Sequence, residues 1–164
     1  MLLHQRTEIR VAITRHRRIA PAVWALAVVL TLLGVGAVGG GAAMVAAPDG
    51  RLIQMDPAWL DGVPLISDWL VPGLVLALVL GVGSLVAAFG LLRRPRWRWA
   101  AAIERVTGQH WSWAATLGLG VFLTLWILMQ FLTIAETHWI QWVYLGVGAF
   151  LALAPLTRTV RRAL

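Results

Sequence analysis

The stretch that decides the fold is LVPGLVLALVLGVGSLVAAFGLL, from Leu70 to Leu92, which contains no charged residue. Asp68 precedes this stretch, and the pair Arg93 and Arg94 follows it. A helix over these residues rises about 1.5 Å per residue and is roughly 34 Å long. That length slightly exceeds the hydrocarbon core of a bilayer, which is about 30 Å thick. The sequence therefore predicts a transmembrane helix over 70–92.

Small side chains recur along one face of this predicted helix, at intervals of three or four residues. They are Gly73, Ala77, Gly81, Ser84 and Ala88. Where a helix face carries only small side chains, the backbone of a second helix can approach it closely. We therefore expect the segment to be the central packing helix of a membrane bundle.

The composition of the whole chain also indicates an integral membrane protein. Hydrophobic residues make up 60% of the 164 residues, and the mean hydropathy is +0.79. All 14 basic residues are arginine, which suits anchoring at the lipid headgroups, although a GC-rich genome explains the same usage. The chain has no cysteine, which excludes disulfide bonds and thiolate chemistry.

Three more apolar segments predict spans, separated by polar segments. The four predicted spans cover about 21–47, 70–92, 111–135 and 139–156. Only Glu136, Thr137 and His138 join the last two spans, and so short a connection requires an antiparallel hairpin. We therefore predict an all-α membrane protein, an antiparallel bundle of four transmembrane helices over 21–156. Two basic segments flank this bundle, at 1–20 and 157–164.

The arginines lie mainly on one side of the predicted membrane. Five precede the first span, five lie between the second and third, and three follow the fourth, so that only Arg51 lies on the opposite side. Cytoplasmic loops collect arginine. We therefore predict a multi-pass protein of the cytoplasmic membrane with both termini in the cytoplasm. Acidic residues dominate the predicted outer loops, namely Asp49, Asp56, Asp61, Asp68 and Glu136.

Our first functional hypothesis follows from the small-residue faces. The first span carries a face of its own with Gly36 and Gly40. Packing through the first and second helices would suit a non-enzymatic accessory or scaffolding subunit, bound to a second copy or to another membrane protein. Because no predicted span contains a charged residue, proton relays and ion-coupled transport are disfavoured. No catalytic triad or phosphate-binding loop is present in the sequence either.

A second hypothesis rests on polar and aromatic residues at the outer ends of the third and fourth helices. These residues are Trp126, Gln130, Trp139, Gln141, Trp142 and Tyr144, with Asp61, Asp68, Glu136 and His138 at the rim above them. In a structural interpretation the glutamines bridge two helices, Asp68 caps the second helix and the tryptophans form an interfacial belt. In a functional interpretation they line an outward-opening pocket for an apolar lipid or quinone, and the protein supports a redox enzyme.

In that functional interpretation, Gln130, Gln141 and Tyr144 hydrogen-bond a head group, and the three tryptophans pack against it. The spacing of Asp68, Glu136 and His138 matches no recognised metal motif, so we predict no metal and no cofactor other than a bound lipid or quinone. Alternating arginine and tryptophan over 93–110 is typical of the membrane interface as well as of nucleic-acid binding. Between two spans we interpret it as an interfacial belt that contacts membrane lipids and not nucleic acid.

Two segments, SDWLVPGLVLALVLGVGSLVAAFGLLRR at 67–94 and HWIQWVYLGVGAFLAL at 138–153, carry a family resemblance. The chain resembles an uncharacterised family of small four-helix integral membrane proteins from high-GC bacteria. The matching features are Asp68 before Pro72-Gly73, the arginine pair, Gln130 after Trp126, and the start of the fourth helix. Trp142 stands where such proteins often have a proline. More distantly the chain is similar to DoxX-like proteins, some of which are associated with quinone-linked oxidoreductases, and this resemblance implies fold alone.

Overall fold

The computed structural model describes residues 20–60, 66–133 and 138–163, all of them helical or in connections between helices. Four helices are long and apolar enough to cross a membrane, which confirms the predicted all-helical fold with four candidate spans. These helices cover Pro21–Ala46, Leu70–Arg93, Trp111–Leu132 and Trp139–Leu156. Residues 134 and 135 of the third predicted span, and residues 1–19 of the basic N-terminal segment, lie outside the described part.

The first and third long helices are α2 (Pro21–Ala46) and α6 (Trp111–Thr133). The second has three parts, α3 (Leu70–Val75), the π-helical η2 (Leu76–Val82) and α4 (Gly83–Arg93). The fourth is α7 (Trp139–Leu153), which η4 (Ala154–Leu156) extends. Short helices occupy the connections and the tail, namely η1 (Pro57–Leu60), η3 (Arg98–Ala100), α5 (Ala101–Thr107) and α8 (Arg158–Ala163).

Local signals set several helix boundaries. Pro21 begins α2, where its missing N–H costs no helical hydrogen bond. The carboxylate of Asp68 accepts a hydrogen bond of 2.9 Å from the Leu70 N–H at the start of α3, although the N-cap position itself is occupied by Trp69 and not by Asp68. At the other end of this long helix, Arg94 has a left-handed conformation with φ of 50°, which terminates α4.

Glycines bring α2 and the second long helix into backbone contact. A Cβ added to Gly41 would lie 2.6 Å from the backbone nitrogen of Ala77 and from the carbonyl oxygen of Gly73. A Cβ added to Gly81 would lie 3.0 Å from the Val38 nitrogen. No side chain fits in either place, so the small-residue face of 70–92 packs inside the chain, against α2.

The face that α2 uses for this contact differs from the one the sequence suggested. It contains Gly34 and Gly41, whereas a Cβ added to Gly36 would meet no atom within 4 Å and one added to Gly40 would meet only Leu76, at 3.6 Å. Residues 34 and 41 are seven positions apart and therefore lie on one side of a helix. The angle at which α2 crosses its partner determines which of its several glycines is used.

A second pair of helices, α6 and α7, packs in the same manner. A Cβ added to Gly120 would overlap the backbone of α7 at Leu151 and Ala152, and one added to Gly148 would lie 2.9 Å from the Thr124 nitrogen. The Trp113 indole N–H also donates a hydrogen bond of 2.7 Å to the Pro155 carbonyl oxygen. The bundle thus consists of a first helix pair, α2 with α3–η2–α4, and a second helix pair, α6 with α7.

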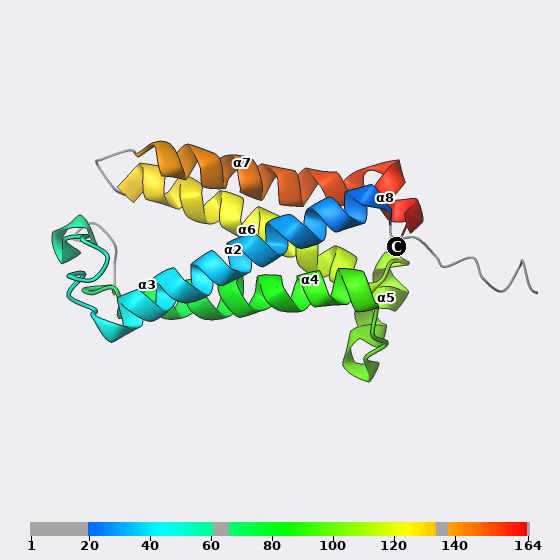
Figure 1. Ribbon diagram of the computed structural model, residues 1–164, viewed down its shortest axis with the longest axis horizontal. Coiled ribbons are helices and arrows are strands. Elements are labelled where there is room, and N and C mark those ends of the chain that lie inside the picture. The colour runs from blue at the N-terminus through cyan, green and yellow to red at the C-terminus, as the bar shows by residue number, and fades with distance from the viewer. Residues whose placement is uncertain (1–19, 61–65, 134–137, 164) are drawn as a thin grey trace, which may run out of the picture.

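The two helix pairs meet closely at one end only. There α4 packs against α6, α8 contacts α2, and the Arg94 guanidinium donates a hydrogen bond of 2.6 Å to the Ala163 carbonyl oxygen. By contrast, α2 and α7 scarcely contact each other, and the pairs diverge toward the opposite end (Figure 1). We call the closed end, with Arg93–Arg98, α5 and α8, the arginine end. The diverging end, with the described connection between α2 and α3, is the loop end.

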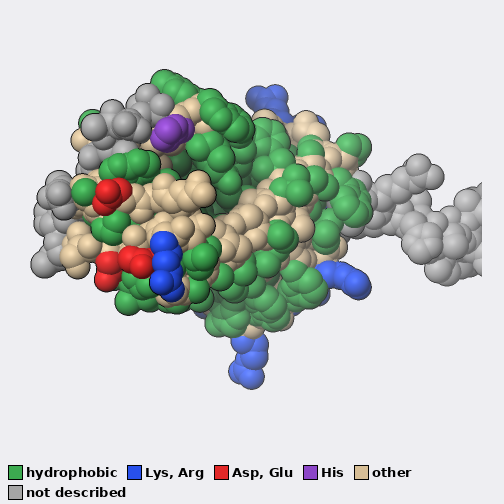
Figure 2. All heavy atoms as spheres, turned by 60° about the vertical axis from the view of Figure 1, so that its left-hand side comes forward, with side chains coloured by type: hydrophobic (Ala, Val, Ile, Leu, Met, Phe, Trp, Pro, Cys, Tyr) green, Lys and Arg blue, Asp and Glu red, His purple; other side chains and the backbone are tan. Residues whose placement is uncertain are grey.

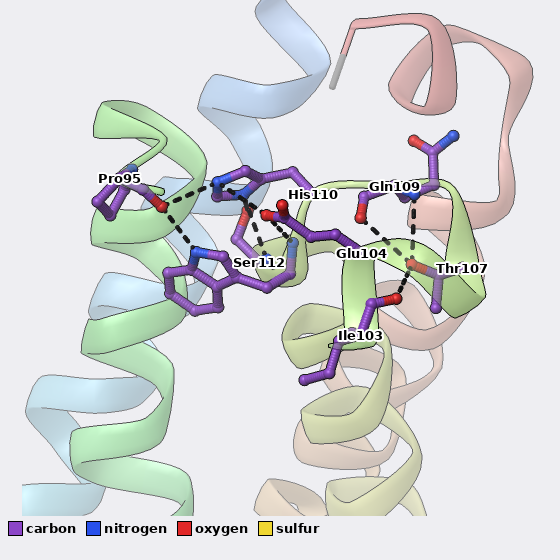
Figure 3. A network of polar contacts seen from close by, with 8 residues as sticks. Pro95, Ile103, Glu104, Thr107, Gln109, His110 and Ser112 are labelled. Carbon is purple, nitrogen blue, oxygen red and sulfur yellow. Dashed lines mark hydrogen bonds and ion pairs between the residues drawn. The ribbon is translucent and has the colours of Figure 1, made fainter. Parts of the chain in front are cut away.

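A polar network holds the connection between α4 and α6 in place at the arginine end (Figure 3). The ring of His110 contacts the Ser112 hydroxyl at 2.8 Å and the Pro95 carbonyl oxygen at 3.2 Å, and it lies 3.7 Å from the Glu104 carboxylate. The indole N–H of Trp111 donates a second hydrogen bond of 3.0 Å to the same Pro95 oxygen. These contacts tie α5 to the start of α6.

Candidate functional site

A cavity of about 260 Å³ lies between the two helix pairs toward the loop end. With this end turned toward the viewer, Figure 2 shows a hollow among hydrophobic side chains. Every long helix contributes to its wall, and so does the connection between α2 and α3. The lining residues are Leu33, Gly36, Ala37, Gly40, Met44, Met55, Trp59, Trp69, Pro72, Leu76, Leu80, Leu123, Trp126, Ile127, Gln130, His138, Ile140, Gln141 and Tyr144.

The part of the cavity nearest the middle of the bundle is entirely apolar. Leu33 on α2, Leu80 on η2 and Leu123 on α6 lie there, and all three side chains belong to the buried core. The wall formed by α2 and η2 carries no polar side chain. Leu80 belongs to the π-helical turn, and π-helical turns inside α-helices are frequent at functional sites.

Among the described residues, the amide, hydroxyl and imidazole groups of the cavity come from α6, from α7 and from His138 just before α7, while Trp59 and Trp69 carry indole N–H groups at the loop end. Gln141 is 7% exposed, and its side-chain oxygen accepts a hydrogen bond of 3.0 Å from the His138 N–H at the start of α7. Gln130 on α6 and Tyr144 on α7 are half-buried. Neither of these two side chains has a hydrogen-bond partner among the described residues. The cavity wall therefore carries one amide and one hydroxyl group without a hydrogen-bond partner in the described part of the chain.

The structure brings together half of the residues that the sequence placed around a pocket. Trp126, Gln130, Gln141, Tyr144 and His138 all line the cavity. Four of them lie on α6 and α7, which pack closely against each other, and His138 immediately precedes α7. The spacing of three and four residues along each helix puts the inward-facing members on one side.

Two of the tryptophans that were predicted to contact a ligand face away from the cavity. Trp139 and Trp142 are 76% and 63% exposed, and Trp142 packs against Phe131, with the ring centroids 5.0 Å apart. Each helical residue is turned by about 100° from the one before, so α7 cannot direct Gln141 and both tryptophans to the same side. Asp68 lies at the start of α3 and does not line the cavity, while Asp61 and Glu136 lie outside the described residues.

The opposite wall of the cavity was not predicted from the sequence. Gly36 and Gly40 form its α2 side, and the prediction that they pack against another helix was wrong for these two glycines. Trp59 and Trp69 close the loop end, and the Trp59 ring lies 6.4 Å from the ring of His138. A glycine that admits a helix and a glycine that leaves a hollow look identical in sequence, so only their surroundings distinguish them.

Metal binding has no support in the described residues. Across 20–60, 66–133 and 138–163, no three His, Asp or Glu side chains are close enough to hold an ion. Of the three residues considered as ligands from sequence, Glu136 lies outside these ranges.

No protein-family model, curated protein or solved structure matches this chain. Its class therefore rests on the architecture itself. Four helices long and apolar enough to span a membrane, with no strand in the described part of the chain, are the architecture of a multi-pass helical membrane protein.

Proposed function

We propose that this protein binds a neutral, largely apolar ligand of the lipid or quinone class in the cavity between the two helix pairs. The observation that carries the proposal is the separation of apolar and polar groups within the cavity. Leu33, Leu80 and Leu123 surround its deep end, and the free polar groups of Gln130 and Tyr144 lie on the second helix pair. Ligand sites in proteins combine an apolar wall with a few polar groups in this way.

The size of the cavity limits the ligand. An apolar cavity of about 150 Å³ binds a benzene ring, so about 260 Å³ suits a substituted ring or a short chain segment. A complete phospholipid is too large. Because α2 and α7 scarcely contact each other, a longer tail would leave the protein between these helices and enter the surrounding lipid.

The charge of the cavity limits the ligand further. Among the described residues, no Asp, Glu or Arg side chain lines it, and His138 and Tyr144 are the only titratable groups in its wall. An ionic head group would lose its hydration there without gaining an opposite charge, which is strongly unfavourable. A carbonyl or hydroxyl oxygen, by contrast, needs only hydrogen bonds. Quinones and isoprenoid alcohols carry such oxygens, and this supports a neutral head group.

The proposed topology directs the cavity to the outer leaflet of the cytoplasmic membrane. The four helices form an antiparallel bundle with both termini in the cytoplasm. The order of the glycine contacts along α2 and its partner supports the antiparallel arrangement. Gly41 approaches Gly73, whereas the earlier Gly34 approaches the later Gly81. The arginines of 93–105 and of α8 gather at the opposite end from the cavity, in agreement with the preference of arginine for the cytoplasmic side.

Two glycine variants on α2 test the binding proposal. A Cβ at Gly36 or at Gly39 meets no atom within 4 Å, but only Gly36 lines the cavity. In native mass spectrometry of protein purified in mild detergent, we expect a small lipid-class ligand on the parent protein and on Gly39→Leu, but not on Gly36→Leu. Equal ligand on both variants, or none on the parent protein, would contradict the proposal.

Scaffolding is the second candidate function, and the exposed glycines of α2 favour it. Gly39 leaves room for a helix of a second copy or of another membrane protein. It ranks second because Gly73 and Gly81, on which the sequence argument depended, already pack against α2. If the protein acts as a scaffold, Gly39→Leu would abolish co-purification of the partner and leave the bound ligand unchanged.

A further inference from the structure

A second hollow lies on the outside of the bundle, at the arginine end. It is an apolar groove of about 570 Å³ between α4 and α6, and η3 and α5 close one end of it. Gly83 and Gly118 lie along its floor, and a Cβ added to Gly118 would meet no atom within 4 Å. The remaining lining residues are Leu78, Val79, Val86, Trp99, Ile103, Trp111, Ala114, Ala115, Leu119 and Phe122. The groove shares no residue with the cavity at the loop end.

The length of the groove matches one leaflet of a bilayer. On α6 it extends from Trp111 to Phe122, which corresponds to about 16 Å along the helix axis. Half of a hydrocarbon core of about 30 Å is roughly 15 Å. Phe122 lies at the middle of α6 (Trp111–Thr133), so the groove extends from the headgroup level to the bilayer midplane. An acyl chain of that leaflet can lie along it.

An arginine lies at the headgroup end of the groove. Arg98 immediately precedes the groove residue Trp99 and is exposed. Arg105 is also exposed, but it follows Ile103 by two positions on α5 and therefore lies on the other side of that helix. The Nε of Arg105 donates a hydrogen bond to the Ala101 carbonyl oxygen, one turn earlier on that same side of α5. The nearby carboxylate of Glu104 is occupied by His110 and by the Trp111 N–H. Within the described chain, no carboxylate forms an ion pair with either arginine.

We infer that this groove binds one acyl chain of an anionic phospholipid and that Arg98 holds its phosphate. The network around His110 supports the site, because Glu104 on α5 contacts His110 and the Trp111 N–H and so ties α5 to the start of α6. Charge complementarity favours an anionic lipid over a zwitterionic one, since each arginine near the surface contributes to binding anionic lipid.

Competition between two lipids with the same chains tests the inference. The protein is purified in detergent, supplied with equal amounts of dioleoylphosphatidylglycerol and dioleoylphosphatidylcholine, and examined by native mass spectrometry. We expect the parent protein to retain phosphatidylglycerol preferentially. The variant Arg98→Gln should lower this preference about fivefold. The matched variants Arg105→Gln, on the other side of α5, and Arg158→Gln and Arg162→Gln, on α8 at the same end, should leave it unchanged.

A groove-filling variant tests the acyl-chain part of the site. Gly118→Leu should reduce the retention of both lipids, whereas Gly146→Leu should not, because Gly146 has equal space around it but lies outside the groove. Equal retention of the two lipids by the parent protein would overturn the inference, as would an equal loss with the α8 variants. Conversion of a dimer to a monomer by Gly118→Leu, with lipid retention unchanged, would assign the groove to a second copy of the chain and also overturn it.

Discussion

The two ends of this bundle use the same helices in opposite ways. At the arginine end the helix pairs are joined by side-chain contacts to the backbone, from Arg94 to Ala163 and from Trp111 to Pro95. At the loop end the same pairs diverge around a cavity of about 260 Å³. Glycine serves both arrangements, because Gly41 lies against the second long helix whereas Gly36 borders the cavity. The comparison shows that a bundle can be firmly joined at one end and hollow at the other.

The largest expected effect is a loss of stability when a glycine packed between two helices is replaced, and an exposed glycine provides the control. Gly41→Leu would force its Cβ against the backbone of Ala77 and Gly73, and overpacking of this kind costs about 3 kcal/mol. Gly39→Leu on the same helix should cost far less. Titration of detergent-solubilised protein with sodium dodecyl sulfate, followed by circular dichroism, measures both. Equal midpoints for the two variants would contradict the close contact between these helices.

A smaller loss of stability is expected from the network at the arginine end. His110→Ala removes contacts to Ser112 and to the Pro95 carbonyl oxygen, and should lower the free energy of unfolding by about 1–3 kcal/mol. Its neighbour provides the control, because the Gln109 side-chain oxygen is buried without a partner among the described residues. Gln109→Leu should therefore be neutral or stabilising. The same titration distinguishes the two, and a larger loss with Gln109→Leu would contradict the assigned contacts.

At the loop end the expected effect is on ligand binding and not on stability. Gln130→Leu removes one hydrogen bond to a bound head group, worth about 1 kcal/mol, and should reduce ligand retention about fivefold. Trp139→Leu should leave retention unchanged, because Trp139 is 76% exposed and does not line the cavity. Native mass spectrometry measures both variants. A stronger effect of Trp139→Leu would favour the ligand contacts expected from sequence over those of the structure.

The smallest expected effect concerns the start of the second long helix. Asp68→Ala removes the hydrogen bond to the Leu70 N–H and should cost about 0.5–1 kcal/mol, because the first N–H groups of a helix have no partner within it. Asp56 makes the same contact to the Ala58 N–H, but it begins η1, which has only four residues. Asp56→Ala should therefore be closer to neutral. Thermal unfolding of both variants in one detergent measures the difference. Equal losses of stability would show that the Asp68–Leu70 hydrogen bond does not stabilise the long helix.

Much of the candidate site was predictable where it depended on a single hairpin. Gln130, Gln141 and Tyr144 were expected together because 134–137 is too short to separate their helices, and all three line the cavity. The opposite wall was not predictable, since it requires the placement of α2 and η2 relative to α6. The π-helical turn at Leu76–Val82 has no signal in an apolar sequence, and it helps to direct Leu76 and Leu80 toward the cavity.

The number of candidate spans and their approximate ends followed from the sequence alone. A transmembrane helix satisfies its own backbone hydrogen bonds and needs only sufficient apolar length, and both requirements are local. The tertiary structure decided which glycines touch another helix, where the bundle remains hollow, and which tryptophans face outward. These features depend on how several helices cross at once, and no single segment contains that information.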